Sequence, residues 1–295
     1  MDIKNYLAAK RILVEESLER YMLQSDERLN GHIEAMRYSL FAGGKRVRPI
    51  LCLAAAETVG GQQEKAMPAA CSLECIHTYS LIHDDLPAMD DDDFRRAKPT
   101  NHKIYGEAGA ILAGDGLLTF AFELLSNPEL AYASENRRLQ VVNLIARAAG
   151  SLGMVGGQAL DIACEGKEIT FETLQFIHSH KTGALITASV QAGAVLGGAA
   201  PEQFKALTEY GEKIGLTFQI VDDLLNVEGT LEQLGKAAGS DAARQKATYP
   251  AFFGVEATKE KARATSESAI DCLHGFGEQA EPLRELARYI VNRKR

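Results

Sequence analysis

The sequence predicts an all-α protein, and three observations support this fold class. The chain has only eight prolines in 295 residues, and it is rich in Ala, Leu, Glu and Lys, which favour helix interiors. Apolar residues recur at three- and four-residue spacing, whereas no stretch alternates between apolar and polar residues as a half-buried strand does. The breaks are short and no linker or repeat divides the chain, so we expect a single domain over residues 1–295.

The expected helices are placed by this periodicity. It covers residues 5–24, 49–59, 68–86, 108–126, 137–150, 171–197, 202–227 and 280–293. Glycine or proline marks the interruptions, as in Gly43-Gly44, Gly60-Gly61, Lys98-Pro99, Asn127-Pro128 and the segments 198–201 and 235–250. Residues 183–198 are apolar on more than one face and include many small side chains, so this helix is expected inside the bundle, close to its neighbours.

Composition and charge narrow the possible functions. The net charge of −8 and the pI near 5.5 argue against non-specific binding to nucleic acid, which requires a basic surface. No run of 18 apolar residues is present, so we expect no transmembrane helix and no stable membrane insertion. The N-terminal segment has no apolar signal core, and the five scattered cysteines suit reduced thiols, which predicts a cytoplasmic protein. Cys71 and Cys75 lie one helical turn apart without a second pair at zinc spacing, so a structural role is expected.

An acidic run follows the third apolar stretch. Six aspartates lie within residues 84–93, and two arginines follow them after Phe94. On an unbroken helix Asp90 would point about 240° away from Asp84, but Pro87 makes an unbroken helix unfavourable. We therefore expect the helix to bend or end here and to fold Asp90 back towards Asp84.

The charge in this run calls for a bound cation. A helix C-terminus disfavours anions because its dipole is negative there, and buried like charges repel. Carboxylate oxygens suit Mg²⁺, which keeps some of its water and bridges to substrate phosphates. Calcium is a competitor, although the glycine and the final glutamate of an EF-hand loop are missing. Taken alone, the run could also be a solvated acidic loop.

A second acidic pair, Asp222 and Asp223, lies in the apolar helical stretch TFQIVDDLLNVEG. Ionised carboxylates in such a stretch need partners, and Asn226 shares a helix face with Asp222. Two acidic clusters that face each other from separate helices would form a site for several metal ions. Basic residues could bind a diphosphate as a set, although each alone could be a solvated surface charge. They are Lys45, Arg46, Arg48, Arg95, Arg96, Lys181, Lys236 and Lys246.

These motifs together carry a specific resemblance. The sequence resembles the trans-prenyl diphosphate synthases, and most of all the bacterial farnesyl diphosphate synthases among them. The matching segments, in the family's order, are GGKRVRP (43–49), HTYSLIHDDLPAMDDDDFRRAKPTNH (77–102), GGQALDI (156–162), HKTGAL (180–185), FQIVDDLLN (218–226), LGK (234–236) and KATYP (246–250).

The resemblance implies a fold and a reaction. The fold is the all-α isoprenoid synthase fold, with long helices around a deep central cavity, in a polyprenyl synthase domain that is usually a homodimer. The reaction is the Mg²⁺-dependent, head-to-tail condensation of isopentenyl diphosphate with an allylic diphosphate, with three ions in the substrate-bound site. The starter would be dimethylallyl or geranyl diphosphate.

The resemblance also implies roles for individual residues. The expected Mg²⁺ ligands are Asp84, Asp90 and Asp222, with Asp85 and Asp223 as further ligands or as residues that act through bound water. The residues expected to hold the allylic diphosphate are Arg95, Lys181 and Lys236. Those expected to hold isopentenyl diphosphate are Lys45, Arg48, His77 and Arg96. The residues expected near the carbocation are Lys181, Thr182 and Gln219, and for Gln158 and Asp161 the support of a basic side chain and plain packing fit equally.

Product length is predicted from the residues that precede Asp84. In the family, an aromatic residue five positions upstream, together with two extra residues inside the aspartate motif, accompanies a C15 product. This sequence has both features, with Tyr79 as the aromatic residue and the small Ser80 beside it. An ideal helix places Tyr79 about 140° around from Asp84, so a role as an ordinary core residue stays open.

Three departures from the family pattern keep alternatives open. Asn226 stands where the second motif usually ends in aspartate, Val221 stands where glutamine is common, and Ala97 replaces a usual glycine. The alternatives are a geranylgeranyl (C20) or geranyl (C10) diphosphate synthase, and a non-catalytic regulatory subunit, which the charge lost at Asn226 would favour. A terpenoid cyclase would need no isopentenyl diphosphate site, so Arg48 and its basic neighbours argue against that class.

Overall fold

The computed structural model describes residues 1–23, 27–130, 133–228 and 247–293. Within these ranges the secondary structure is helical apart from one two-stranded ribbon, which confirms the all-α class. The helices are α1 (Ile3–Tyr21), α2 (Asn30–Leu40), α3 (Val47–Thr58), α4 (Gln63–Asp84), α5 (Asn101–Ser126), α6 (Glu135–Ala149), α7 (Met154–Cys164), α8 (Phe171–Ile177), α9 (Ala184–Gly197), α10 (Pro201–Glu228), α13 (Tyr249–Phe253), α14 (Val255–Asp271) and α15 (Glu281–Asn292). A π-helical segment, η2 (His178–Gly183), joins α8 to α9.

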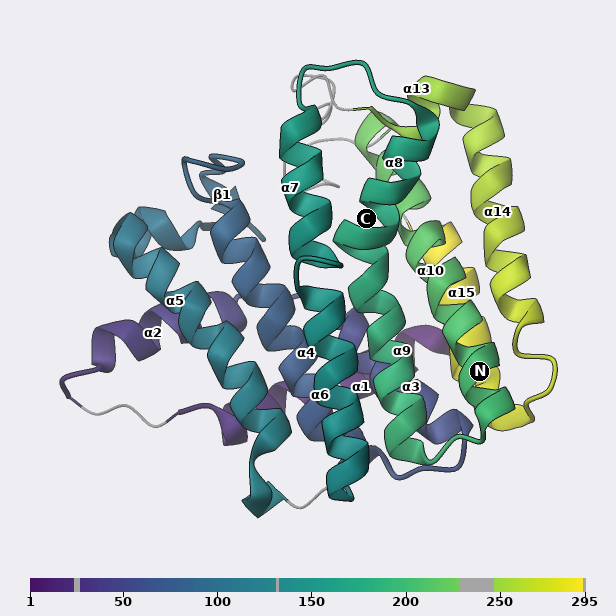
Figure 1. Ribbon diagram of the computed structural model, residues 1–295, viewed down its shortest axis with the longest axis horizontal. Coiled ribbons are helices and arrows are strands. Elements are labelled where there is room, and N and C mark those ends of the chain that lie inside the picture. Colours follow the sequence, from purple (N-terminus) through teal and green to yellow (C-terminus); the bar gives the residue numbers. More distant parts are fainter. Residues whose placement is uncertain (24–26, 131–132, 229–246, 294–295) are drawn as a thin grey trace.

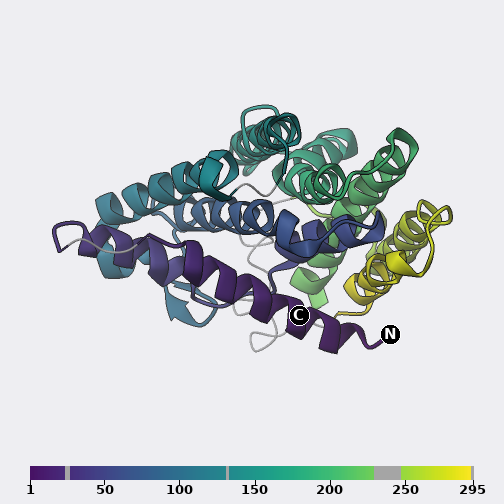
Figure 2. The ribbon, with the colours of Figure 1, turned by 90° about the horizontal axis from the view of Figure 1, so that it is seen from below.

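The helices form a bundle in which α3, α4 and α9 lie between two outer groups (Figure 1). On one side α4 packs against α5, and on the other α9 packs against α10, which in turn packs against α14. The buried side chains form two hydrophobic clusters, and both α3 and α9 contribute to each of them. This confirms that residues 183–198 are buried on more than one face. Helix α1 crosses the bundle, and its N-terminal end lies near α15 (Figure 2). The single domain stays a prediction.

Helices α2, α7, α13 and α14 were not predicted. In α14 the residues that face the bundle include Thr258, Ala262, Ser266 and Ala269. They keep the three- and four-residue spacing of a packed face, but they are small or carry a hydroxyl group. Such a face packs closely against a neighbour without a marked hydrophobic signal, which explains why periodicity alone missed the helix.

Two stretches are long and apolar enough to cross a membrane by length and composition, namely Asn101–Ser126 and Glu135–Cys164. Neither stretch is an unbroken apolar run, because charged residues interrupt both, among them Asp115 in the first and Arg147 in the second. The first stretch is α5, which packs against α4, and a turn between α6 and α7 breaks the second. Core helices of a bundle pass the same test, so the expected lack of membrane insertion stays a prediction.

A short hairpin follows the acidic run and was not predicted. Strands β1 (Phe94–Arg95) and β2 (Lys98–Pro99) pair antiparallel. The two residues that join them, Arg96 and Ala97, have φ angles of 54° and 60°, as a type I′ turn requires. That turn normally favours Asn-Gly, so the segment RRAK carried no hairpin signal.

We expect Ala97→Gly to stabilise the protein by up to about 1 kcal/mol. A left-handed conformation costs an L-residue about 1–2 kcal/mol, and the greater freedom of glycine in the unfolded chain offsets part of this gain. Urea unfolding would measure the change. The matched control is Ala9→Gly on the exposed face of α1, which should instead lose about 0.5–1 kcal/mol. A free energy of unfolding that falls in Ala97→Gly would contradict the prediction.

Arg46 belongs to the protein interior, although the sequence placed it among the candidate diphosphate ligands. It precedes α3 with a φ angle of 53° and is 2% exposed. Its guanidinium donates hydrogen bonds to Glu74 Oε1 at 2.6 Å and to the Leu40 carbonyl at 2.7 Å. Glu74 is buried as well. The pair therefore fixes the start of α3 against α4.

We expect Glu74→Gln to destabilise the protein by about 3–5 kcal/mol, because it removes the buried partner of Arg46 and leaves the more exposed Glu15, 3.5 Å from its Nε, as the remaining ion pair. Thermal or denaturant unfolding would show the loss as a lowered transition midpoint. The control is Glu285→Gln, which breaks an exposed pair with Arg288 and should cost no more than about 1 kcal/mol. Equal losses in the two variants would refute a special role for the buried pair.

Candidate active site

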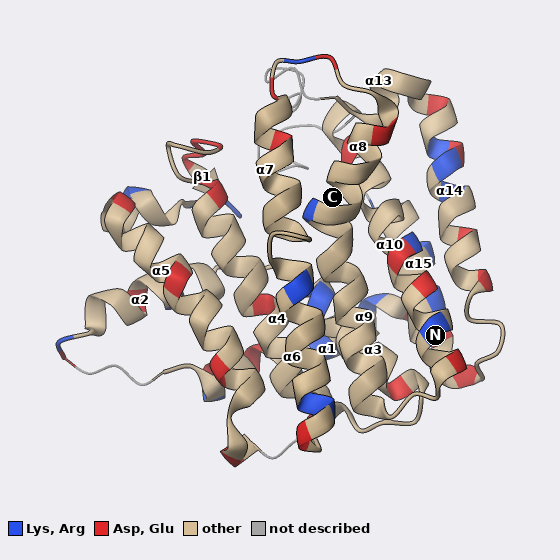
Figure 3. Cartoon of the chain, viewed as in Figure 1, with Lys and Arg blue, Asp and Glu red and all other residues tan. Residues whose placement is uncertain are grey.

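The helix that carries the first acidic motif ends where the sequence predicted. Helix α4 stops at Asp84, and the chain after Pro87 turns back so that the Asp90 amide donates to the Asp84 carbonyl at 2.8 Å. Burial raises the pKa of Asp84 to about 6, with Lys181 acting in the opposite direction and the charge of Asp90 adding to the increase. The loop that follows is strongly acidic (Figure 3). The end of α4 and the loop after it therefore carry six aspartates between residues 84 and 93.

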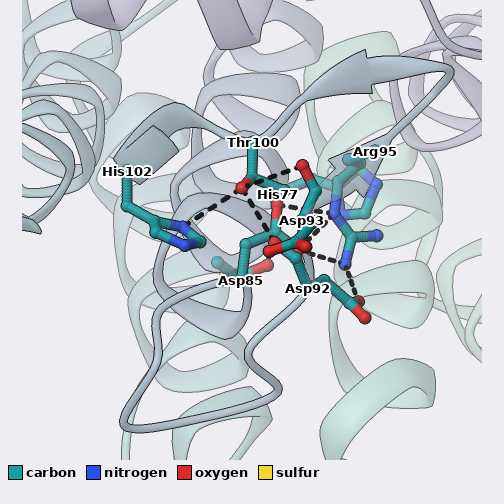
Figure 4. A network of polar contacts seen from close by, with 8 residues as sticks. His77, Asp85, Asp92, Asp93, Arg95, Thr100 and His102 are labelled. Atoms are coloured by element: carbon teal, nitrogen blue, oxygen red, sulfur yellow. Dashed lines mark hydrogen bonds and ion pairs between the residues drawn. The ribbon is translucent and has the colours of Figure 1, made fainter. Parts of the chain in front are cut away.

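Asp85 faces a different partner. Its buried carboxylate accepts from Arg95 Nε, at 2.7 Å and 2.8 Å for the two oxygens, and Arg95 also reaches Asp92 at 3.3 Å. The three residues form one network with the start of the hairpin (Figure 4). Asp85 thus holds Arg95 at the edge of the acidic turn, where the guanidinium lowers the pKa of Asp84.

Asp222 lines the same cavity as Asp84, but from α10. Its side chain is 42% exposed, and the accessible part faces this cavity. One carboxylate oxygen pairs with Arg293, just beyond α15. The deep position raises the pKa of Asp222, while Arg293, Lys45 and Arg48 act to lower it. The two acidic motifs therefore meet at one cavity, as the sequence predicted.

The motifs do not form a closed metal site by themselves. In the part of the chain that the structure describes, no three Asp, Glu, His or Cys side chains converge closely enough to hold an ion. Asp84 and Asp222 stand on separate walls of the cavity. Ions placed between them would need a substrate or water to complete their coordination, which is the usual arrangement for Mg²⁺.

Asp223 is engaged by protein groups. Its Oδ1 accepts from Gln219 Nε2 at 3.1 Å, and its Oδ2 accepts from the Tyr249 amide at 2.8 Å. Gln219 in turn accepts from the Thr182 hydroxyl at 2.9 Å. Asp223 therefore fixes the amide of Gln219, and through it the hydroxyl of Thr182. Gln219 lines a smaller polar cavity of about 110 Å³, whereas Thr182 borders both that cavity and the larger one.

Lys181 is placed by the π-helical segment η2, an irregularity that often marks functional sites. Its Nζ lies 2.7 Å from Asp161 Oδ2 on α7. A Cβ atom at Gly157 would lie 2.3 Å from the Lys181 backbone nitrogen, so only glycine lets α7 approach this closely. Of the two uses left open for Asp161, support of a basic side chain is the one observed. The motif GGQALDI lies on α7, although apolar periodicity did not predict this helix.

Of the basic residues expected around isopentenyl diphosphate, Arg48 and Arg96 act on His77. Burial and the charges of Arg48, Arg96, Arg95 and Arg46 lower the pKa of His77 well below its ordinary value, so the imidazole is neutral near pH 7. His77 and Arg48 line the large cavity, and Arg48 Nε has no hydrogen-bond partner there. A neutral donor among several cations is a suitable environment for an anion.

Two members of that basic set lie outside the large cavity. Arg96 donates to the Gly43 carbonyl and lines a cavity of about 30 Å³ under the hairpin. Gly44, whose Cα lies close to the Arg96 guanidinium, has a φ angle of 135°, which L-residues rarely adopt, so glycine is needed here. Lys45 lines a separate cavity of about 210 Å³ beside α15. Lys236 and Lys246 lie outside the described residues.

The large cavity has a volume of about 480 Å³ and an apolar inner part. Tyr79 and Ser80 of α4 line it, so Tyr79 does face the cavity, which helical geometry alone left undecided. Opposite them α7 contributes Met154 and Val155, and α10 contributes Phe218. Sequence analysis missed these three residues because apolar side chains at helical spacing look like ordinary core residues. Carboxylates and cations thus meet beside an apolar pocket, as an enzyme acting on a diphosphate with a hydrocarbon tail requires.

Comparison with known proteins confirms this class. The model of the polyprenyl synthetase family matches residues 31–282, and the chain belongs to that family. It is a prenyltransferase of the trans-prenyl diphosphate synthase class, as the sequence motifs indicated.

Its relatives carry more than one product name. A chloroplastic geranylgeranyl pyrophosphate synthase of Capsicum annuum is 50% identical over 99% of this chain and 79% of its own length. A farnesyl diphosphate synthase of Geobacillus stearothermophilus is 48% identical over 91% of this chain and 90% of its own. The crystal structure of an FPP/GFPP synthase from Zymomonas mobilis matches with a TM-score of 0.88 and 37% identity, over 98% of this chain and 99% of that one.

Proposed function

We propose that the protein is a Mg²⁺-dependent farnesyl diphosphate synthase. It joins isopentenyl diphosphate head-to-tail to dimethylallyl and then geranyl diphosphate, and it stops at the C15 product. The observation that carries the proposal is the position of Tyr79, which lines the apolar cavity five residues before Asp84. At about 1.5 Å per residue, its Cα lies roughly 7.5 Å along the helix axis from that of Asp84, and its ring in the cavity would limit the growing chain.

Mg²⁺ would be held by Asp84, Asp90 and Asp222, and we expect three ions in the substrate-bound site. The donors fit the ion, because hard carboxylate oxygens gather at the end of α4, where the charge of Asp90 adds to the effect of burial in raising the pKa of Asp84. When bound, the ions would neutralise the charge that develops on the departing diphosphate. Asp85 and Asp223 would act from behind these ligands, through Arg95 and Gln219.

The chain's own residues bind and orient the two substrates. Arg95 and Lys181, with Lys236, would hold the allylic diphosphate, and Asp85 and Asp161 keep the first two in place. Arg48 and neutral His77 would hold isopentenyl diphosphate from inside the cavity, with Lys45 and Arg96 adding positive charge from its surroundings.

The reaction balances without a protein base. The allylic C–O bond breaks and its electron pair leaves with the diphosphate. The isopentenyl double bond then forms the new C–C bond to the cation, and the departing diphosphate takes up the proton that is lost. The Thr182 oxygen, oriented by Gln219, would direct its dipole at the cation. Apolar residues such as Phe218 keep out water, which would convert the cation to an alcohol.

We further propose that the enzyme is a cytoplasmic homodimer that binds no nucleic acid. Exposed apolar side chains on neighbouring helices support a self-association surface, namely Ile111 and Leu112 of α5, Leu139 of α6 and Leu152 in the following turn. Isolated exposed residues of this kind are common, but a group on adjacent elements favours an interface. Light scattering after gel filtration should report twice the 32.0 kDa chain mass.

A C20 product is the second candidate, favoured by the several relatives named geranylgeranyl synthases at 46–50% identity. One incubation separates the possibilities. Purified protein receives dimethylallyl diphosphate, labelled isopentenyl diphosphate and Mg²⁺, with a chelator control, and the dephosphorylated products are sized. A metal-dependent C15 alcohol supports the proposal, whereas C10 or C20 replaces the product assignment. If the folded protein catalyses no condensation, the non-catalytic regulatory subunit becomes the better assignment, and the charge lost at Asn226 is the feature that would explain it.

A further inference from the structure

Arg293 makes a specific contact inside the protein, although it lies at the end of the described chain. Helix α15 buries Leu286 and Ile290 in the bundle and ends at Asn292, directly before it. The Arg293 side chain is 3% exposed and pairs with Asp222. It also donates to the Phe218 carbonyl at 3.2 Å, and its guanidinium carbon lies 3.9 Å from the centroid of the Phe218 ring.

This contact separates two cavities. Asp222 lines the large cavity, Arg293 lines the cavity of about 210 Å³ beside α15, and Phe218 borders both. Arg293 therefore reaches Asp222 from behind the substrate cavity. Its positive charge compensates the negative charge of Asp222, the first carboxylate of the second acidic motif.

A guanidinium and a divalent cation compete for such a carboxylate. Asp222 pairs with a guanidinium that is 3% exposed, and an ionised carboxylate inside a cavity needs a positive partner in either state. Lys45 and Arg48 also act on this carboxylate, so an added divalent ion meets positive charge from several directions. The contact with Arg293 is made on the carboxylate oxygen itself.

We propose that Arg293 occupies the position beside Asp222 that a divalent cation would take, and that its side chain must move away when the cation binds. Arg293 thereby lowers the affinity of the second acidic motif for metal. The proposal rests on the proposed function, in which Asp222 is a metal ligand. Withdrawal would also open the partition at Phe218 between the two cavities. Arg293 is then a positioning residue, which holds Asp222 in the metal-free enzyme.

The test is direct binding of Mn²⁺ to the full chain, followed by the electron paramagnetic resonance signal of the free ion. Arg293→Gln removes the charge, and we expect it to bind Mn²⁺ roughly tenfold more tightly than the natural chain, within the usual range for two coupled ligands. Arg293→Lys keeps the charge and should stay close to the natural chain. Arg288→Gln, at an exposed pair on α15, is the matched control and should change nothing.

The outcomes separate the two proposals. If Asp222→Asn and Asp84→Asn leave Mn²⁺ affinity unchanged, the metal role of the motifs fails, and the Arg293 proposal fails with it. If those variants weaken binding but Arg293→Gln is unchanged or weaker, only the Arg293 proposal is overturned. Equal tightening in Arg293→Lys would also overturn it, because the charge would then not be the cause. A second readout is thermal unfolding, in which Mn²⁺ should raise the midpoint of Arg293→Gln more than that of the natural chain.

Discussion

Replacing Tyr79 with alanine should lengthen the main product from C15 to C20 or longer. The expected change is one of product distribution, with condensation itself preserved, because Tyr79 lies away from the charged end of the cavity. Dephosphorylated products from a radiolabelled incubation would be separated by chain length. The ratio of C20 to C15 alcohol is the quantity to compare between Tyr79→Ala and the natural enzyme.

The reason is the volume that the Tyr79 ring occupies at the wall of the cavity. The side chain is 6% exposed, lines the cavity, and packs edge-on against His83 with ring centroids 5.7 Å apart. Ser80 beside it is too small to replace the ring as a wall. Truncation to alanine would leave a void that the surrounding helices fill only partly, and an additional isoprene unit could extend into it.

Two matched variants make the prediction specific. Tyr79→Phe keeps the ring and should keep the C15 product, since the argument depends on volume and not on the hydroxyl group. Ser80→Ala changes the neighbouring position without adding bulk and should also keep it. An unchanged C15 product from folded Tyr79→Ala would remove the basis for the farnesyl assignment, and so would a longer product from Tyr79→Phe.

The features that the sequence predicted correctly are those with a strong local sequence signal. The all-α class rested on periodicity summed over many turns, and the end of α4 at Asp84 followed from Pro87. The type I′ turn at Arg96 and Ala97 could not be predicted, because neither residue type favours positive φ. Helix α14 was missed since small buried residues such as Ala262 carry little hydrophobic signal.

Within the site, the sequence indicated which residue types are needed more reliably than which groups each residue contacts. Arg46 and Arg48 stand two positions apart in one motif, yet the first pairs with Glu74 in the interior while the second lines the cavity. Only the fold decides this, because the left-handed backbone at Arg46 turns its side chain inward. Arg293 was missed because a basic C-terminus usually indicates a solvated end, and no local pattern relates it to Asp222.

The second large effect is expected for Asp84→Asn, which should lower kcat by about 10²–10³-fold, the usual loss when one electrostatic stabiliser of a developing charge is removed. Asparagine keeps the shape of the side chain but cannot offer an ionised oxygen to a metal. Steady-state rates at several Mg²⁺ concentrations would measure the loss. A rate that saturating Mg²⁺ restores fully would mean that Asp84 serves only metal affinity.

The same substitution should stabilise the metal-free protein, and this separates loss of function from loss of fold. Because the folded-state pKa of Asp84 is about 6, above the ordinary value near 4, the folded protein binds the proton more tightly than the unfolded chain does. Ionised Asp84 therefore lowers the free energy of unfolding above pH 6. This loss of stability disappears as the pH falls from about 6 towards the unfolded-state pKa near 4. In EDTA at pH 7 we expect Asp84→Asn to raise the free energy of unfolding by roughly 1–3 kcal/mol. The difference should shrink at pH 5. A variant that is both inactive and less stable at pH 7 would show instead that Asp84 supports the turn after α4 more than it serves the reaction.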